Sequence, residues 1–461
     1  FLKKFYPENF FSHIIIDECH RSAWGKWSQV LTRNPNAVQV GLTATPRKLQ
    51  IGGKTPEAEE DARITADNIN HFGEPVYEYD LGQGIEDGYL AACEIHRFDL
   101  FHDHKKISER DTEITKRDLK GKFLTNAHTG LAADPSQLKK RYQPWDLENT
   151  LLMPERVDAM CKHLFDRLLK SGEPEQKTII FCARDSQADA VAIAMNNLYA
   201  DWCREQGKTR LDPYAFKCTA SVNGNQYLAD LRGASRSHFI ATTVELLTTG
   251  VDVPVVRNIV FFKYVRSPIA FYQMIGRGTR LDAPTGKHMF HIYDYTDATR
   301  LFNKEFITRL SPKGKGGNGP PPPSPIQVEG FDIHVTDAGR YILTMLDGRT
   351  QPVTVEEYKA ILAARLVAEA PTLEKFRDHW INPSERREML GHLPDAGRSA
   401  MLIQKLESMD DYDLYDVLGE IGYGLAPRTK PDRAEAFTYK HAGWLSSLPP
   451  KTSTTLKDVR F

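Results

Sequence analysis

Short apolar runs that alternate with helical patterns are the feature that most limits how this chain can fold. They are bounded by polar residues or glycine and read HIIIDE (residues 13–18), AVQVGLTAT (37–45), KTIIFCA (177–183), SHFIATT (237–243), VRNIVFFK (256–263) and HMFHIYDY (288–295). Runs of this length, separated by helical segments, are typical of buried parallel strands. We therefore predict an α/β fold built on parallel sheets.

Composition places the chain among ordinary globular proteins. Its 461 residues are 41% hydrophobic and 26% charged, which suits about two to four domains and excludes overall disorder. The 60 lysines and arginines nearly balance the 61 acidic residues, so any surface for nucleic acid has to come from local sorting of charge. Apolar runs are too short to span a bilayer, and we predict no membrane partner.

Cysteine usage and the N-terminal sequence bear on location and completeness. Six cysteines are scattered without a C-x-x-C pair, which indicates neither a zinc site nor a disulfide framework and favours a reducing cytoplasm. The chain begins with Phe1, and little sequence precedes the first strand to complete a sheet. We therefore expect a fragment of a longer protein.

A Gly- and Pro-rich stretch, SPKGKGGNGPPPPSP at residues 311–325, is predicted to be a linker. After it, residues 328–346 are expected to form two strands around a turn at residues 337–340. Beyond Val355, apolar residues recur three and four positions apart, so the C-terminal part is predicted to be mostly helical.

Paired acids follow the first strand directly. Asp17 and Glu18 come after three isoleucines, which puts both carboxyl groups at the carboxyl end of a parallel strand, where open α/β sheets bind ligands. Asp17 can hold Mg²⁺ through water, and Glu18 can orient or deprotonate an attacking water. Acid pairs at strand ends are common, so this pair alone does not establish catalysis.

The next strand ends in Gly-Leu-Thr-Ala-Thr-Pro, and the hydroxyls of Thr43 and Thr45 are expected beside the acid pair. DECH followed by GLTATP resembles motifs II and III of the superfamily 2 helicases and translocases. That resemblance implies two RecA-like domains that hydrolyse ATP between them, with Mg²⁺ as the metal. It also makes His20, Thr43 and Thr45 candidate nucleotide-binding residues.

The phosphate-binding loop of that superfamily, G-x-x-x-x-G-K-[ST], belongs upstream of motif II. Only 16 residues precede Asp17, so the loop cannot lie in its proper place. Residues 52–55, GGKT, imitate its tail, but they follow motif III and are interpreted as a surface loop. We therefore expect the chain alone to lack a competent ATP site.

A second set of motifs lies further along the chain. KTIIFCA resembles motif IV, and LTTGVDVP at residues 247–254, preceded by Thr242 and Thr243, resembles motif V. The resemblance implies that Thr248 and Thr249 contact a nucleic-acid phosphate. It also implies that the turn containing Gly250 and Asp252 approaches nucleotide.

QMIGRGTR, residues 273–280, resembles motif VI. On a helix, Gln273, Arg277 and Arg280 would share one face, because they are spaced four and three apart. Two guanidinium groups there could stabilise charge on a transferring phosphate. The alternative is a pair of surface arginines in ion pairs.

Further segments narrow the resemblance. EPVYEY with GI and DGYL at residues 74–90, and LEKFRDHWINP at residues 373–383, are similar to parts of the motor (R, restriction) subunit of type I restriction enzymes. This family translocates double-stranded DNA with ATP and assembles with methyltransferase and specificity subunits. Its nuclease domain lies N-terminal to the motor, so we expect no nuclease here. Glu109, Asp111 and Glu113 are interpreted as a solvated loop.

DNA contacts are expected to be mostly to phosphates, which suits a motor that steps along any sequence. Candidates are Lys116 and Arg117, with Lys120 and Lys122 nearby. Plain surface charge is an equally good interpretation of each.

The expected domains are the C-terminal part of a first RecA-like domain (residues 1–100), an insertion (101–150), a second RecA-like domain (151–310), the linker (311–325) and a mostly helical domain (326–461). We expect the last to dock onto the methyltransferase, although it could instead buttress the motor. A strand-separating repair or RNA helicase, and a non-enzymatic DNA- and partner-binding module, remain alternatives.

Overall fold

The computed structural model describes residues 2–19, 28–43, 71–103, 105–106, 114–134, 136, 138–222, 224–233, 235–245, 252–302, 325–346 and 348–458. These residues belong to two compact units, one formed by Phe1–Asp80 with Cys93–Arg340, the other by Leu81–Ala92 with Tyr341–Phe461. The predicted linker lies outside the described residues except for Pro325. Each unit is considered separately below.

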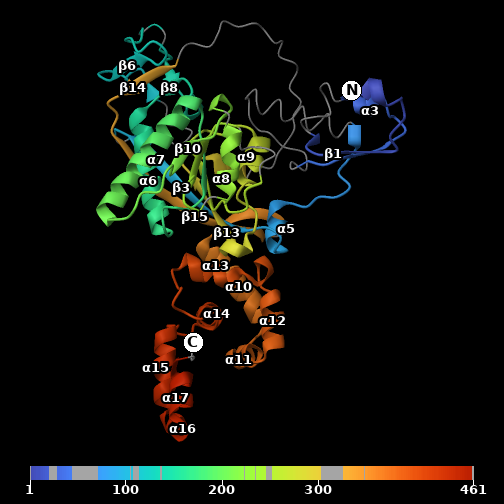
Figure 1. The fold of residues 1–461 in the computed structure, drawn as a ribbon, viewed down its shortest axis with the longest axis vertical. Coiled ribbons are helices and arrows are strands. Elements are labelled where there is room, and N and C mark those ends of the chain that lie inside the picture. The colour runs from blue at the N-terminus through green and yellow to red at the C-terminus, as the bar shows by residue number, and fades with distance from the viewer. Residues whose placement is uncertain are drawn as a thin grey trace. The chain divides into compact units, whose positions relative to one another are not determined.

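The first unit is organised around the large sheet visible in Figure 1. In spatial order its strands are β10 (Ala215–Lys217), β11 (Ile240–Thr243), β9 (Thr178–Phe181), β12 (Asn258–Phe261), β13 (Met289–Asp294), β3 (Ala92–His102) and β15 (Ile333–Leu346). Every pairing from β10 to β13 is parallel. All residues of β9, β11 and β12 are buried, which is why these strands are mostly apolar rather than alternating. The predicted α/β architecture with a parallel sheet is confirmed.

Two long helices, α6 (Pro154–Lys170) and α7 (Asp185–Gln206), pack against each other, and α7 also contacts β10 and β11. Helix α6 has proline at its first position, where no backbone N–H is needed. Helix α7 ends at Gly207, whose φ of 62° closes the last turn in the left-handed region. Among the described residues, the shorter helices of this unit are α1 (Leu2–Phe5), α3 (Ser28–Thr32), α8 (Leu228–Gly233) and α9 (Pro268–Ile275).

The N-terminal segment forms a separate parallel pair, β1 (His13–Ile16) and β2 (Val38–Gly41). Ile14 and Leu31 form the centre of a small core beneath it. The pairing sets Ile16 opposite Gly41, so the residues that follow both strands emerge at the same edge. The two N-terminal strands predicted from the sequence are therefore confirmed.

The structure differs from the sequence prediction in two segments. Strand β3, whose residues were expected in the first motor domain, lies between β13 and β15 in the large sheet. Residues 337–340, expected to form a turn, lie inside the single strand β15. Both errors concern strands whose partners are distant in sequence, which local patterns do not reveal.

Residues 105–152 contribute short strands. They are β4 (Lys105–Lys106), β5 (Ile114–Thr115), β6 (Phe123–Asn126), β7 (Arg141–Tyr142) and β8 (Leu151–Leu152). Strand β14 (Ile326–Glu329) pairs with β6 and β8. Ile114, Leu119 and Tyr142 are buried in the main core, so this insertion is more than a polar loop.

The second unit is mostly helical, as predicted. Its helices are α5 (Leu81–Glu86), α10 (Val355–Glu369), α11 (Leu373–Ile381), α12 (Pro383–Gly391), α13 (Ser399–Leu406), α14 (Leu414–Tyr423), α15 (Lys430–Lys440), α16 (Ala442–Ser447) and α17 (Pro450–Asp458). Strand β16 (Arg349–Thr354) pairs with the last residues of β15, and Thr354 with Glu357 forms a capping box that starts α10. Within the described ranges, no helix is both long and apolar enough to cross a membrane.

Candidate nucleotide site

The predicted acids lie in a tight turn directly after β1. The Glu18 backbone N–H donates to Asp17 Oδ1 at 2.9 Å. Glu18 has a φ of 53°, in the left-handed region that costs a residue with a Cβ about 1–2 kcal/mol. Backbone strain of this kind is concentrated at functional sites. Asp17 is exposed and Glu18 half-buried, so both carboxyl groups can be reached from solvent.

The turn is bonded to the end of β2. Leu42 N–H donates to Ile16 O at 2.8 Å, and Cys19 N–H donates to Leu42 O at 2.9 Å. Thr43 therefore follows directly beside the turn, as the sequence predicts. His20 and Thr45 lie outside the described residues, as does the GGKT segment at residues 52–55.

Gln273 approaches Glu18 from helix α9. The Gln273 side chain is buried, and its Nε2 lies 3.5 Å from Glu18 Oε2. Ser267 caps the start of α9 by accepting a hydrogen bond from Ala270 N–H. The structure thus joins the acid turn to the segment that resembles motif VI, although Glu18 and Gln273 are 255 residues apart.

The prediction that Gln273, Arg277 and Arg280 share one face of a helix is only partly correct. Helix α9 ends at Ile275, so Arg277 lies in the following turn and Arg280 beyond it. Two glycines, Gly276 and Gly278, disfavour continuation of the helix. Arg277 Nε donates to Gln273 O at 3.4 Å, which keeps this arginine next to Gln273. Burial lowers the pKa of Arg277, while the carboxylate of Glu18 acts in the opposite direction.

Arg280 and Asp252 form an ion pair between the segments resembling motifs VI and V. Arg280 Nε lies 3.4 Å from Asp252 Oδ1, and each side chain is 61% exposed. Thr248, Thr249 and Gly250 lie outside the described residues. Thr242 is committed to the core, since its hydroxyl donates to Ala188 O at 2.8 Å.

The basic candidates for DNA contact differ in surroundings. Lys116, Arg117 and Lys120 are exposed in the turn after β5. Lys122 instead makes contacts within the protein: its ammonium lies 2.8 Å from Asp103 Oδ2 and 4.4 Å from the centre of the Phe331 ring. The acids Glu109, Asp111 and Glu113 lie outside the described residues.

A polar cluster that the sequence does not reveal lies on β3 and β13. Glu94 is buried, and its carboxylate lies 3.1 Å from His96 Nε2 and 2.8 Å from His291 Nδ1. Burial raises the pKa of Glu94, but hydrogen bonds from His291 and His96 outweigh this and leave it well below its usual range. These three side chains could hold a metal ion. Arg340 already pairs with Glu94 and provides the compensating positive charge, so we interpret the cluster as structural.

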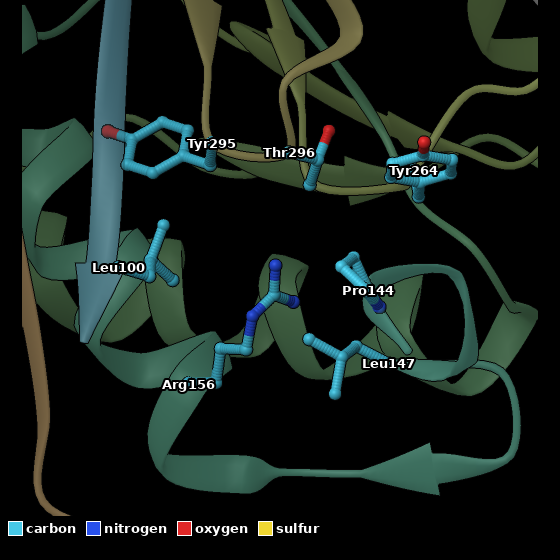
Figure 2. A pocket seen from close by; sticks show the side chains of 7 residues that line it. All are labelled: Leu100, Pro144, Leu147, Arg156, Tyr264, Tyr295 and Thr296. Carbon is cyan, nitrogen blue, oxygen red and sulfur yellow. The ribbon is translucent and has the colours of Figure 1, made fainter. Parts of the chain in front are cut away.

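A small cavity lies where the chain leaves β13, and Figure 2 shows the guanidinium of Arg156 pointing into it. Arg156 pairs with the buried Glu148 at 3.4 Å, and among the described residues its Nε has no hydrogen-bond partner. The cavity has about 10 Å³ of free space, roughly enough for one water molecule. It is therefore too small for a nucleotide.

Asp17 has the oxygen chemistry that Mg²⁺ prefers, and its exposure leaves room for the water shell that Mg²⁺ retains. When bound with ATP, that ion would neutralise phosphate charge. Glu18 follows Asp17 directly and lies 3.5 Å from Gln273 Nε2, while Arg277 bonds to Gln273 O and is close enough to Glu18 for the carboxylate to affect its pKa. This arrangement can activate a water and stabilise negative charge.

Two protein families match parts of the chain. Residues 2–48 match the res subunit of type III restriction enzymes, and residues 155–282 match the helicase conserved C-terminal domain. The first match contains the acid turn, and the second contains Gln273, Arg277 and Arg280.

The chain is 27% identical over 482 residues to the endonuclease subunit of the type I restriction enzyme EcoAI from Escherichia coli, covering 93% of this chain and 55% of that subunit. It is 26% identical over 370 residues to the EcoKI endonuclease subunit of E. coli K12, covering 76% of this chain and 27% of that subunit. A fragment assigned as an HsdR subunit of a type I restriction enzyme from Vibrio vulnificus YJ016 is 32% identical, with a TM-score of 0.46, covering 66% of this chain and 47% of that one. The chain therefore resembles the R subunits of type I restriction enzymes, and it spans about half of EcoAI's subunit and less of EcoKI's.

Proposed function

We propose that this chain is part of an ATP-driven translocase of double-stranded DNA, the R subunit of a type I restriction enzyme. The observation that carries the proposal is the 3.5 Å approach of Gln273 Nε2 to Glu18 Oε2. It brings the acid pair beside the segment that bears Arg277, and the resemblance to R subunits supports the same chemistry.

In this proposal Glu18 activates the water that attacks ATP, and Gln273 orients the Glu18 carboxylate. Arg277 or Arg280 stabilises the charge that develops on the transferred phosphate. Thr43 with His20 and Thr45, and Asp252 with Gly250, contact the nucleotide. Lys116, Arg117, Thr248 and Thr249 contact DNA phosphates.

Translocation and strand separation are distinguished by two assays on the complete subunit, assembled with its methyltransferase and specificity subunits. A translocase displaces a third strand from a triplex in an ATP-dependent manner while leaving the duplex intact. Arg277→Ala should abolish this displacement, and Arg33→Ala, on the same unit but beside Glu8, should not. Separation of the duplex strands would favour a repair or RNA helicase instead, and DNA binding without ATP turnover would favour a binding module.

The 461-residue chain alone should hydrolyse ATP negligibly, because a phosphate-binding loop is expected to lie upstream of the acid turn in this superfamily. Turnover is measured by phosphate release with and without duplex DNA. Robust turnover by the chain alone would mean that another segment, such as residues 52–55, cradles the phosphates.

A further inference from the structure

Lys287 is a buried lysine that no motif accounts for. Its exposed fraction is 0%, and it lies two residues before β13. Its ammonium donates to two main-chain carbonyls, Pro254 O and Gly278 O, each at 2.8 Å. The backbone of Lys287 is fixed as well, since it exchanges two hydrogen bonds with Asp282.

The two carbonyl groups belong to different functional segments. Pro254 follows Asp252 by two residues, and Gly278 lies between Arg277 and Arg280. One side chain therefore joins the segment that resembles motif V to the segment that resembles motif VI. The bond to Gly278 reaches the residue directly after Arg277.

The contacts on the surface are weaker than those made by Lys287. The Arg280–Asp252 ion pair also joins the two segments, but each partner is 61% exposed, and exposed pairs contribute only about 0–1 kcal/mol. Packing helps to fix the motif VI segment, because Gly278 lies so close to Phe290 that an added Cβ would be 2.3 Å from the ring. Packing against Phe290 sets the position of Gly278. The bonds from Lys287 set the distance between Gly278 and Pro254.

A lysine in this place is costly. The pKa of Lys287 is lowered to about 7, chiefly by burial and to a lesser extent by Arg257, while Asp282 acts in the opposite direction. An apolar side chain would fill the same volume without that cost, but it would leave both carbonyls without this donor. What the ammonium provides is a fixed distance between the two segments.

We propose that Lys287 is a positioning residue that holds the segments around Asp252 and Arg277 in register, so that the arginines reach the nucleotide correctly. The inference rests on the proposed ATPase function. It predicts a loss in the chemical step rather than in ATP binding, because Lys287 is buried beneath the segments and cannot touch the nucleotide.

A second buried lysine provides a matched control. Lys177 Nζ donates to Ser237 O at 3.0 Å and His238 O at 2.9 Å, and it is 9% exposed. A third, longer bond goes to Asp230 O at 3.3 Å. Lys177 begins the segment that resembles motif IV, but neither it nor its carbonyl partners is a proposed catalytic, nucleotide-binding or DNA-binding residue. Lys177→Met thus removes the same type of contact from the same unit without affecting the register of motifs V and VI.

The test compares Lys287→Met, Lys287→Gln, Lys177→Met and Arg277→Ala in the complete subunit, with DNA-stimulated ATPase and melting temperature measured for each. Lys287→Met should lower kcat by roughly 10- to 100-fold and change the KM for ATP by less than about threefold. Lys287→Gln, whose shorter side chain keeps an NH2 group that can donate, should recover part of the loss. Lys177→Met should lower the melting temperature comparably while leaving kcat close to wild type.

Equal kcat in Lys287→Met and Lys177→Met would overturn the positioning role, as would failure of both Lys287 variants to fold when Lys177→Met folds. Undiminished ATPase in Arg277→Ala would instead refute the assignment of Arg277 in the proposed function. The two failures are therefore distinguishable.

Discussion

Replacing Glu18 by Gln tests the proposed chemistry most directly. The amide has the shape of the carboxylate and keeps an oxygen that can accept from Gln273 Nε2, 3.5 Å away in the native protein. It cannot accept a proton from water. The substitution thus removes the general base while leaving the contact with α9 largely in place.

The size of the effect follows from the role assigned to Glu18. General-base catalysis contributes about 10²- to 10⁴-fold, which corresponds to roughly 3–5 kcal/mol in the activation barrier. The fold should be nearly unaffected, since Glu18 is half-buried and Gln is isosteric; we expect a change below about 0.5 kcal/mol in unfolding free energy. ATP binding should be retained because only water activation is lost.

The assay is DNA-stimulated phosphate release by the complete subunit, with ATP affinity measured separately by a fluorescent analogue. Glu8→Gln is the matched control, because Glu8 lies in the same N-terminal segment and its side chain is 70% exposed. Among the described residues, the ion pair that Glu8 forms is with Arg33, 25 residues further along the chain, at 3.3 Å. Wild-type turnover in Glu18→Gln would refute the assignment. Loss of ATP affinity equal to the loss of turnover would show that Glu18 binds nucleotide rather than activating water.

Two further predictions concern Asp252 and Glu148. Asp252→Asn should change the unfolding free energy measured in urea by less than about 1 kcal/mol, because the pair with Arg280 is exposed, while lowering ATPase activity; a large stability loss with normal ATPase would contradict this. Burial raises the pKa of Glu148 from 4.5 to about 7, despite the opposing effect of Arg156. A carboxyl group with a raised native pKa favours folding below about pH 4.5 and loses that contribution as the pH rises through 7, so the stability of wild type relative to Glu148→Gln should fall by roughly 3 kcal/mol between pH 4.5 and 8. A difference that is flat with pH would show that the pKa of Glu148 is not raised in the native protein.

The elements that could be predicted from the sequence are those specified by local composition. Strands β9, β11 and β12 are buried on both faces, so their residues are mostly apolar and stand out from the flanking helices. The turn at Asp17 could be predicted because three consecutive isoleucines mark the end of β1. Candidate site residues next to such strands can therefore be predicted without knowledge of their partners.

What the sequence did not reveal depends on contacts between distant residues. Nothing local indicates that Glu94 meets His291, or that Lys287 reaches Pro254 and Gly278. The end of α9 at Ile275, in contrast, could have been predicted from local sequence, because Gly276 and Gly278 follow it closely. Their low helix propensity outweighed the three- and four-residue spacing of the motif.

The position of strands β14 and β15 changes how partner docking has to be tested. Val328 and Phe331, which follow the predicted linker, are buried in the main core of the first unit, and β14 pairs with β6 and β8. Truncation at residue 311 would remove these residues and destabilise the first unit itself. Loss of assembly after such a truncation would not distinguish docking from buttressing, so a surface substitution is required.

Helix α10 offers that substitution. Ala360 lines a recess of about 560 Å³ in the second unit, together with Ile403 of α13 and Val417 of α14. From the resemblance to R subunits, we propose that the methyltransferase binds at this recess, whose lining includes charged as well as apolar residues. Ala360→Arg should therefore weaken its binding at least about tenfold, because the long side chain would occupy the recess. Ala364→Arg is the control, because Ala364 is exposed on the same helix and does not line the recess. Affinity is measured by titrating the complete subunit with the methyltransferase complex while DNA-stimulated ATPase is followed separately. Unchanged affinity in Ala360→Arg, or a loss of ATPase with intact assembly, would favour a helical unit that buttresses the motor.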